Sequence, residues 1–430
     1  MPEYENVKVY GNLKISLLTG EAFLNIVAPI DSKSQNGDRY ELIYGFSTNG
    51  RLLSLQDCII NETPSCSPGL KTQKISVEQI YIRCSRMGRR DNYHDPSKKI
   101  KKIIAGFTYL NDWIDIPLFE LDVSKTNDNR YIFKETHIVP EDHPVKLKIN
   151  DFVVKFRFKY GFGELGSHYI DSSQIITEHY FETALEIETD KALSLELWFN
   201  LILNPIRELI TLGTLMPNWI STLSLVEFTK EREVYTKMYS RNIVCKRKNE
   251  KLKFHEMLFC FDDIRNNFAE VIMTWFDIQG KAKYLLGAFF STLQSKDMYL
   301  EHRFLTLTQV GEAYHRVFGD LKKVDFVDKE GRNRKRDPFL KERFEELLQN
   351  VNKELVNEVI PEKEKFLDIV RDTRNALSHL DIEGKRHVAN HSEMQMLINQ
   401  LNALLFMLLL DSLKISHNNI LSNYRRYRPL

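Results

Sequence analysis

The sequence predicts an α+β multidomain protein, with a β-rich N-terminal domain over residues 1–190 and an all-α region over residues 191–430. Residues 7–190 hold short runs rich in Val, Ile, Tyr and Phe, the residue types that favour strands. From residue 191 onward, apolar residues recur three and four positions apart, which is the spacing of amphipathic helices. The chain of 430 residues is long enough for about two to four domains, each with its own core.

The expected strands are separated by turn signals. Thr48-Asn49-Gly50 stands between two of them and supplies residues that tolerate positive φ, which indicates a hairpin. Such a series of short strands favours an antiparallel sandwich or barrel. The runs concerned are VKVYGNLKIS, YELIYGFSTNGRLLSLQDCII, KISVEQIYIRC, KIIAGFTYL and HPVKLKINDFVVKFRFKYGF.

The helical pattern begins with LSLELWFNLILNPIRELITLGTL, where Pro205 predicts a kink or a break. The polar stretch VDFVDKEGRNRKRDP contains Gly331 and predicts an exposed loop. Five further segments each carry an apolar stripe: HEMLFCFDDIRNNFAEVIMTWFD, RFLTLTQVGEAYHRVFG, PFLKERFEELLQNV, PEKEKFLDIVRDTRNALSHL and SEMQMLINQLNALLFMLLLDSL.

The helix expected from about Pro361 is the most informative of these, because its two faces differ sharply. At ~100° per residue, one face forms a packing stripe, and Arg374 lies on the flank about 80° away. The stripe consists of Phe366, Val370, Thr373, Leu377 and Leu380. The opposite face is polar and gathers Asp368, Arg371, Asp372, Asn375, Ser378 and His379.

Composition excludes several functional classes. Lys and Arg number 60 against 59 Asp and Glu, so the whole chain has no field that would bind nucleic acid indiscriminately. The N-terminus resembles no secretion signal, and the longest apolar run, Ala403–Leu410, is far short of the ~20 residues that span a bilayer. Five cysteines without a C-x-x-C pair indicate buried free thiols. We expect a cytoplasmic protein with no membrane segment, no metal and no cofactor.

The run Arg374-Asn375-Ala376-Leu377-Ser378-His379 is similar to the R-x4–6-H signature of HEPN domains. Residues 301–316, EHRFLTLTQVGEAYHR, resemble the preceding helix of the ApeA-like branch of that superfamily. The segments GFSTNGRLLSLQDCII and IIAGFTYLNDWI resemble the N-terminal domain of the same branch more diffusely. The resemblance is strong over roughly 295–412 and loose before it.

This resemblance implies a metal-independent endoribonuclease of bacterial anti-phage defence, acting by abortive infection. It implies a HEPN-type helical bundle with a core at about 255–415, which dimerises and takes RNA as its substrate. The N-terminal domain would then sense a phage-derived trigger or restrain the nuclease. The family motif carries over only to Arg374 and His379.

The residue types suit that chemistry. Histidine as a residue type ordinarily has a pKa near ~6.5, so a histidine at position 379 suits proton exchange with the 2′-OH or the 5′-oxygen. Arg374 can stabilise charge on the phosphate, and Asn375, one turn before His379, can hold the imidazole or a phosphate oxygen. Arg371 and Ser378 are candidate substrate-binding residues.

Arg374 and His379 point about 140° apart on a regular helix, so one helix cannot aim both at one phosphate. A site shared across a two-fold dimer solves this, unless the helix ends near Ser378 and an irregular last turn brings them together. The alternative function is a non-catalytic HEPN-type scaffold for RNA binding or dimerisation.

Other polar features have structural interpretations beside functional ones. Glu312 and His315 in EAYHR could form an acid–base pair, although structural use is favoured. The run Arg332–Arg336 either contacts RNA phosphates or is a solvated loop, and the tail Tyr424–Arg428 has the aromatic and cationic pattern of a single-strand contact. The lysines of 98–102 indicate a protected strand edge.

Overall fold

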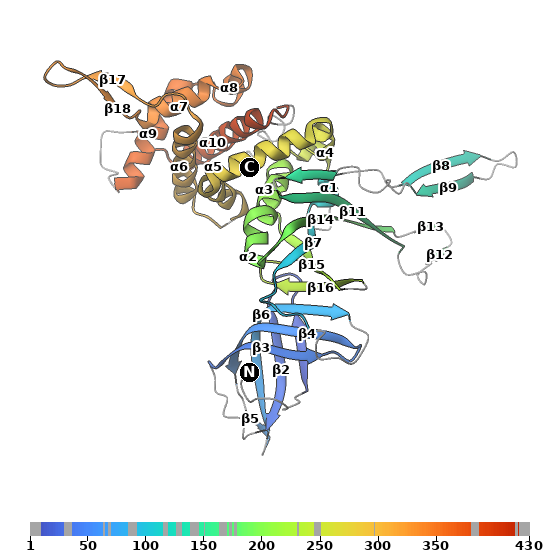
Figure 1. Ribbon diagram of the computed structural model, residues 1–430. Helices are drawn as coiled ribbons and strands as arrows, with labels where there is room; N and C mark the ends of the chain where they lie inside the picture. Colours follow the sequence, from blue (N-terminus) through green and yellow to red (C-terminus); the bar gives the residue numbers. More distant parts are fainter. Residues whose placement is uncertain are drawn as a thin grey trace. The chain divides into compact units, whose positions relative to one another are not determined.

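The computed structural model divides the chain into two compact units (Figure 1). The N-terminal unit comprises residues 1–111, 116–207 and 218–250, and the helical unit comprises residues 112–115, 208–217 and 251–430. The structure describes residues 10–29, 37–62, 65–67, 70–84, 93–114, 119–125, 131–137, 146–149, 151–162, 170–171, 174–175, 179–229, 232–244, 251–295, 297–379, 387–417 and 420.

The N-terminal unit is built on one antiparallel sheet of 12 strands, with the main order β1-β2-β6-β16-β15-β7-β14-β11-β10 and with β3, β4 and β5 branching beside β6. Its strands are β1 (Gly11–Ile15), β2 (Ala22–Pro29), β3 (Arg39–Phe46), β4 (Arg51–Glu62), β5 (Ser65–Ser67), β6 (Leu70–Cys84), β7 (Ile100–Phe107), β10 (Lys146–Ile149), β11 (Phe152–Phe162), β14 (His179–Leu193), β15 (Ile220–Phe228) and β16 (Glu233–Ser240). Two small ribbons accompany the sheet: β8 (Phe119–Lys125) with β9 (Tyr131–His137), and β12 (Ile170–Asp171) with β13 (Gln174–Ile175).

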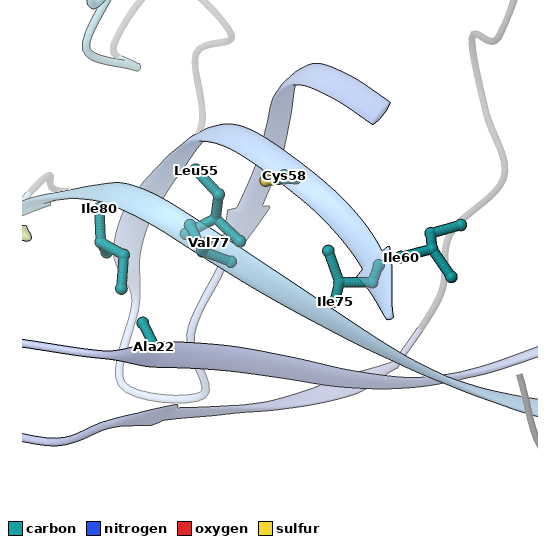
Figure 2. Packing of buried hydrophobic residues seen from close by; sticks show 7 residues of the cluster. All are labelled: Ala22, Leu55, Cys58, Ile60, Ile75, Val77 and Ile80. Atoms are coloured by element: carbon teal, nitrogen blue, oxygen red, sulfur yellow. The ribbon is translucent and has the colours of Figure 1, made fainter. Parts of the chain in front are cut away.

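Strand β6 joins two parts of this sheet. Its first half pairs with β2, its second half pairs with β16, and β4 runs along its other side. Strands β2, β4 and β6 thereby enclose an apolar cluster (Figure 2). Each large aliphatic side chain buried in this way contributes about 1.5–3 kcal/mol. The cluster consists of Ala22, Leu55, Cys58, Ile60, Ile75, Val77 and Ile80.

The structure confirms two of the expected buried thiols. Cys58 and Cys260 are both free and buried. Burial, with a smaller contribution from the charge of Asp57, raises the pKa of Cys58 to about 12. A thiol with so high a pKa stays protonated at neutral pH and behaves as a small apolar side chain.

Two strands correct the expectation that residues 191–430 are all helical. Strands β15 and β16 lie between β6 and β7, near the middle of the sheet. Strand β15 has Ile220, Leu223, Leu225 and Val226 buried, a pattern too dense for a clear period of two. Pairing with strands distant in sequence therefore decides their structure, which local periodicity cannot reveal.

The expectation of a strand edge at residues 98–102 is also wrong. Strand β7 has a neighbour on each side, because it pairs with β14 and with β15. The ammonium group of Lys102 is nearly buried and lies 2.9 Å from a carboxylate oxygen of Glu186 and 2.9 Å from one of Glu233. This lysine is a paired interior charge, and it does not protect an edge.

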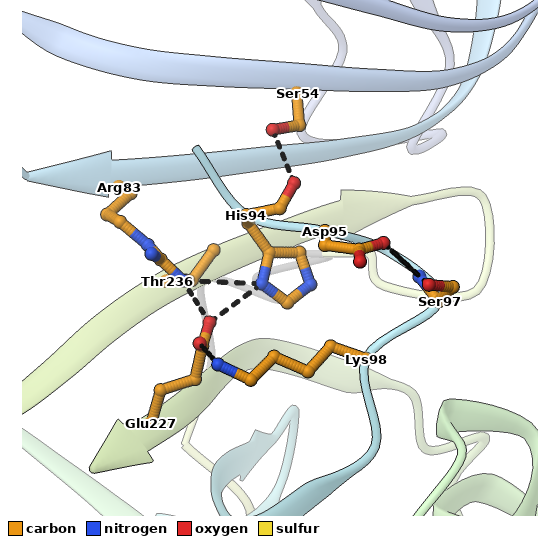
Figure 3. Close-up of polar contacts among 8 residues, drawn as sticks. All are labelled: Ser54, Arg83, His94, Asp95, Ser97, Lys98, Glu227 and Thr236. Carbon is orange, nitrogen blue, oxygen red and sulfur yellow. Dashed lines mark hydrogen bonds and ion pairs between the residues drawn. The ribbon is translucent and has the colours of Figure 1, made fainter. Parts of the chain in front are cut away.

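A buried carboxylate organises the loop before β7 (Figure 3). Glu227 of β15 accepts hydrogen bonds from Arg83 and Lys98, and its Oε1 lies 2.9 Å from Nδ1 of His94. Arg83 also donates from Nε to the Thr236 hydroxyl at 3.0 Å. Burial favours a raised pKa for Glu227, but the hydrogen bonds from His94 and Lys98 and the charge of Arg83 overcome it and lower this pKa to about 2.

Five short helical segments precede the bundle: α1 (Leu110–Ile114), α2 (Leu195–Trp198), the π-helical segment η2 (Phe199–Leu203), α3 (Asn204–Thr214) and α4 (Phe261–Ile264). The 3₁₀ turns η3 (Phe254–Glu256) and η4 (Arg265–Asn267) flank α4. The bundle of the helical unit consists of α5 (Phe268–Gln294), α6 (Leu300–Phe318), α7 (Leu340–Gln349), α8 (Lys353–Val359), α9 (Lys363–His379) and α10 (His391–Leu413).

Helix α10 is strongly apolar. By length and composition alone it could cross a membrane, but 72% of its most apolar window is buried inside the protein. It packs against α5, α6 and α8, and the Tyr314 hydroxyl of α6 lies 3.2 Å from the Leu408 carbonyl. These contacts are those of a core helix in a folded bundle.

The stretch expected as an exposed loop forms a hairpin instead. Strands β17 (Val324–Val327) and β18 (Asn333–Arg336) pair in antiparallel fashion and stand out from the helices between α6 and α7 (Figure 1). Its residues are mostly exposed, so the predicted exposure is correct and the predicted lack of structure is wrong.

Candidate active site

Helix α9 carries the predicted site residues and is anchored by its apolar stripe. Phe366, Val370 and Thr373 are buried, as the sequence predicts. The Thr373 hydroxyl also accepts a hydrogen bond of 2.9 Å from the backbone N–H of Ala389. Leu377 is only half-buried and Ala376 fills the buried position of that turn, while Leu380 lies outside the described residues.

Arg374 is aligned by a residue on another helix. Its Nη2 lies 3.5 Å from Oε2 of Glu312 on α6. The side chain of Arg374 is 31% exposed and that of Glu312 is 13% exposed, so the pair lies at the margin between the interior and the surface. Nη1 of Arg374 also donates to the side-chain oxygen of Asn375 at 3.4 Å. The guanidinium group is therefore held against α6 but remains accessible.

His379 is the last residue of α9 and is exposed. The helix continues through Ser378, so the irregular last turn that could have joined the two motif residues within one chain is not formed. Arg374 and His379 consequently point about 140° apart. Among the described residues, no hydrogen bond or ion pair engages the imidazole.

Arg371 is paired more heavily than the sequence suggests. Its Nε donates to Oδ1 of Asp372 at 2.9 Å, and its Nη1 lies 3.0 Å from Oδ1 of Asp368. Asp368 in turn lies 2.9 Å from the ammonium group of Lys341 on α7. The hydrogen bond with Asp372 raises the pKa of Arg371, and the two carboxylates offset its charge. Ser378, the other predicted substrate-binding residue, is exposed.

The chain matches known protein families over most of its length. A family model described as ApeA N-terminal domain 1 matches residues 1–275, and one described as Apea-like HEPN matches residues 305–419. The chain belongs to the ApeA-like HEPN family. No curated protein and no solved structure matches it.

The family confirms the predicted fold class and gives the function in outline. A mainly antiparallel sheet region is followed by a helical HEPN domain, as the sequence predicts. The chain is an anti-phage protein of HEPN type. HEPN domains are generally nuclease-like, and they commonly dimerise and bind RNA. The HEPN match includes Glu312, Arg374 and His379.

The EAYHR sequence of α6 divides into two roles in this HEPN domain. His315 is buried, and its Nε2 lies 2.6 Å from a carboxylate oxygen of Glu346 on α7. Its Nδ1 lies 3.1 Å from Nη1 of Arg343. His315 is therefore structural, as the sequence analysis favours. Glu312 is different, because it contacts Arg374. The signal for this role in the sequence is an acidic residue three positions before a histidine, and that pattern is too common to decide it.

No group of three or more His, Cys, Asp or Glu that could hold a metal occurs among the residues that the structure describes. The guanidinium group of Arg374 instead lies beside the carboxylate of Glu312 and the side-chain amide of Asn375. Such a set offers one cation to an anionic ligand, and it places a counter-charge behind that cation.

Proposed function

We propose that this ApeA-like HEPN protein is a metal-independent endoribonuclease of abortive infection, acting on RNA in the cytoplasm. The observation that carries the proposal is the arrangement on α9. Arg374 is aligned by Glu312 and is still accessible, and the exposed His379 ends the same helix. A dimerisation scaffold requires neither an aligned cation nor a free imidazole.

The reaction requires two proton transfers and one charge-stabilising group. The 2′-oxygen forms a bond to phosphorus, its proton passes to a base, the bond from phosphorus to the 5′-oxygen breaks, and that oxygen receives a proton. Imidazole can serve in either transfer, since its pKa for this residue type is near neutral. Arg374 would contact the non-bridging oxygens, and Asn375 would hold one of them or the imidazole. Arg371 and Ser378 would bind the neighbouring phosphates.

The active site is proposed to be shared between two chains. Glu312 holds Arg374 toward α6, and His379 points about 140° away on the same helix. In an isologous dimer formed through the HEPN domains, Arg374 of one protomer can face His379 of its partner. The N-terminal unit would respond to a phage-derived trigger and control this site.

Incubation of the purified protein with total RNA, with and without EDTA, tests the proposal. We expect cleavage in both samples, with 2′,3′-cyclic phosphate and 5′-OH ends. Products with a 5′-phosphate, or a requirement for Mg²⁺, would contradict the mechanism. Tight RNA binding without cleavage by a folded dimer would favour the scaffold function instead.

A further inference from the structure

The β17–β18 hairpin is a built structure and not a passive linker. Asp328 organises its turn, since Oδ1 accepts hydrogen bonds of 2.9 Å from the backbone N–H groups of Glu330 and Arg332. Gly331 has a φ of 80°, a conformation that favours glycine. Four cross-strand pairs, from Val327 with Asn333 to Val324 with Arg336, continue the ladder toward the bundle. The hairpin therefore presents its side chains in a fixed register.

One side of the hairpin places arginines beside aromatic rings. Phe326 lies directly opposite Arg334 in the ladder, and Arg336 is on the same side of β18. The guanidinium group of Arg336 lies 3.7 Å from the centre of the Phe339 ring. The Phe339 side chain is 64% exposed and that of Phe326 is 36% exposed. Exposed rings with neighbouring guanidinium groups suit stacking of unpaired bases together with phosphate contact.

The hairpin is basic in a chain that is nearly neutral. Residues 324–336 contain five Lys and Arg against three Asp and Glu, whereas the whole chain of 430 residues has a net charge of only +1. Lys335 forms an ion pair with Asp325 in which both side chains are exposed, and such a pair is worth only ~0–1 kcal/mol. Arg334 pairs through Nε with the largely buried carboxylate of Asp328, but its side chain stays 51% exposed to a polyanion.

The base of the hairpin and the polar face of α9 each form an ion pair with the first turn of α7. Arg336 binds both carboxylate oxygens of Glu342 in the first turn of α7, at 2.7 and 2.6 Å. Lys341, the residue before Glu342, contacts Asp368 of α9, which pairs with Arg371. Arg371 lies one turn before Asn375, so this polar surface leads from the hairpin to the proposed active site.

We propose that the β17–β18 hairpin is a binding arm for single-stranded RNA, which grips the substrate beside the α9 site. The inference rests on the proposed function for the identity of the substrate. Phosphates contact Arg334 on the aromatic side of the hairpin and Lys335 on its other side, so that the strand wraps around the arm, and unpaired bases stack on Phe326 and Phe339. Duplex RNA, whose bases are already stacked, gains only the phosphate contacts.

The test uses the full-length dimer and a labelled single-stranded RNA of 12 nucleotides with 2′-O-methyl groups. The probe cannot be cleaved by 2′-OH attack, so binding is measured apart from catalysis. The test variant is Arg334→Gln with Lys335→Gln. The matched control, Lys281→Gln with Lys283→Gln, removes two exposed charges from α5. Loss of two phosphate contacts should lower the affinity for the probe about tenfold. It should also make the slope of log K against log salt concentration less negative by about 1.4.

The control variant should bind as the wild type does. Phe339→Ala should bind the single-stranded probe about tenfold more weakly and leave the affinity for duplex RNA unchanged. Unchanged affinity and salt slope in the hairpin variant would overturn the inference. So would an equal loss in the control, or a loss that light scattering attributes to dissociation of the dimer.

A wild-type protein that does not bind the probe also overturns the inference. Cleavage of ordinary RNA by the wild type is assayed in parallel, so the two proposals can fail separately. If binding depends on the hairpin but no RNA is cleaved, the proposed nuclease function is refuted and the proposed RNA-binding hairpin is supported. If RNA is cleaved but binding does not depend on the hairpin, the proposed RNA-binding hairpin is refuted and the nuclease function is supported.

Discussion

The guanidinium group of Arg374 on α9 and the carboxylate of Glu312 on α6 lie 3.5 Å apart at the surface of the helical unit. The two residues are distant in sequence, and they meet because α6 packs beside α9. Glu312 thus turns Arg374 toward α6 and away from the direction of His379. The contact favours one orientation of the arginine before any substrate binds, which lowers the cost of ordering it later.

Glu312→Gln should lower RNA cleavage about tenfold in kcat without changing the melting temperature appreciably, since it removes a charge but keeps the shape of the side chain. Glu312→Asp, which keeps the carboxylate, should recover part of the activity. Single-turnover kinetics and thermal melting measure both effects. The control is Glu301→Gln, an exposed position on the same helix. Equal activity in the Glu312→Gln and Glu301→Gln proteins would show that Glu312 does not position Arg374.

His379→Ala should reduce cleavage by roughly 10²–10⁴, the usual contribution of general acid–base catalysis. The protein should melt as the wild type does, because His379 is exposed at the end of α9. His391→Ala, at an exposed position at the start of α10, is the matched control. Cleavage at the wild-type rate by a folded His379→Ala protein would refute the assignment.

A mixed dimer of Arg374→Ala and His379→Ala chains should recover part of the cleavage that each homodimer lacks. One of its two sites then contains an intact Arg374 and an intact His379 if the residues act in trans. Two affinity tags allow the mixed dimer to be purified, and end-mapping measures the cleavage. An inactive mixed dimer of verified stoichiometry, or an active monomer, would show that the site lies within one chain.

Glu227→Gln should destabilise the N-terminal unit by about 3–5 kcal/mol at pH 7, because it leaves the buried Arg83 without its counter-charge. The carboxylate has a folded-state pKa of about 2 against an ordinary value of 4.5. Its contribution is therefore complete above the ordinary pKa and is lost as the pH falls from about 4.5 toward 2.

Denaturant unfolding of wild type and Glu227→Gln across this pH range measures the difference. The gap between the two proteins should be constant near neutral pH and should close in acid. Glu41→Gln, at an exposed position on β3, should show no comparable gap. A gap that does not depend on pH would show that the Glu227 charge does not stabilise the unit.

The sequence by itself determined the features that depend on local pattern. Spacing was enough for the apolar stripe of Phe366, Val370 and Thr373, because burial on a helix follows its period. The β-rich first half and the helices of the second half followed from residue type and period. The motif residues Arg374 and His379 stand within six consecutive letters, and their catalytic role stays a prediction.

Only the tertiary structure decided the features that depend on partners far away in the sequence. Strands β15 and β16 exist because β6 and β7 lie on either side of them, and Lys102 is interior because β7 has two neighbours. Glu312 became the partner of Arg374 only when α6 packed beside α9. The period of a helix or strand decides which way each of its side chains faces. Which residues a side chain then contacts depends on the packing of the whole chain.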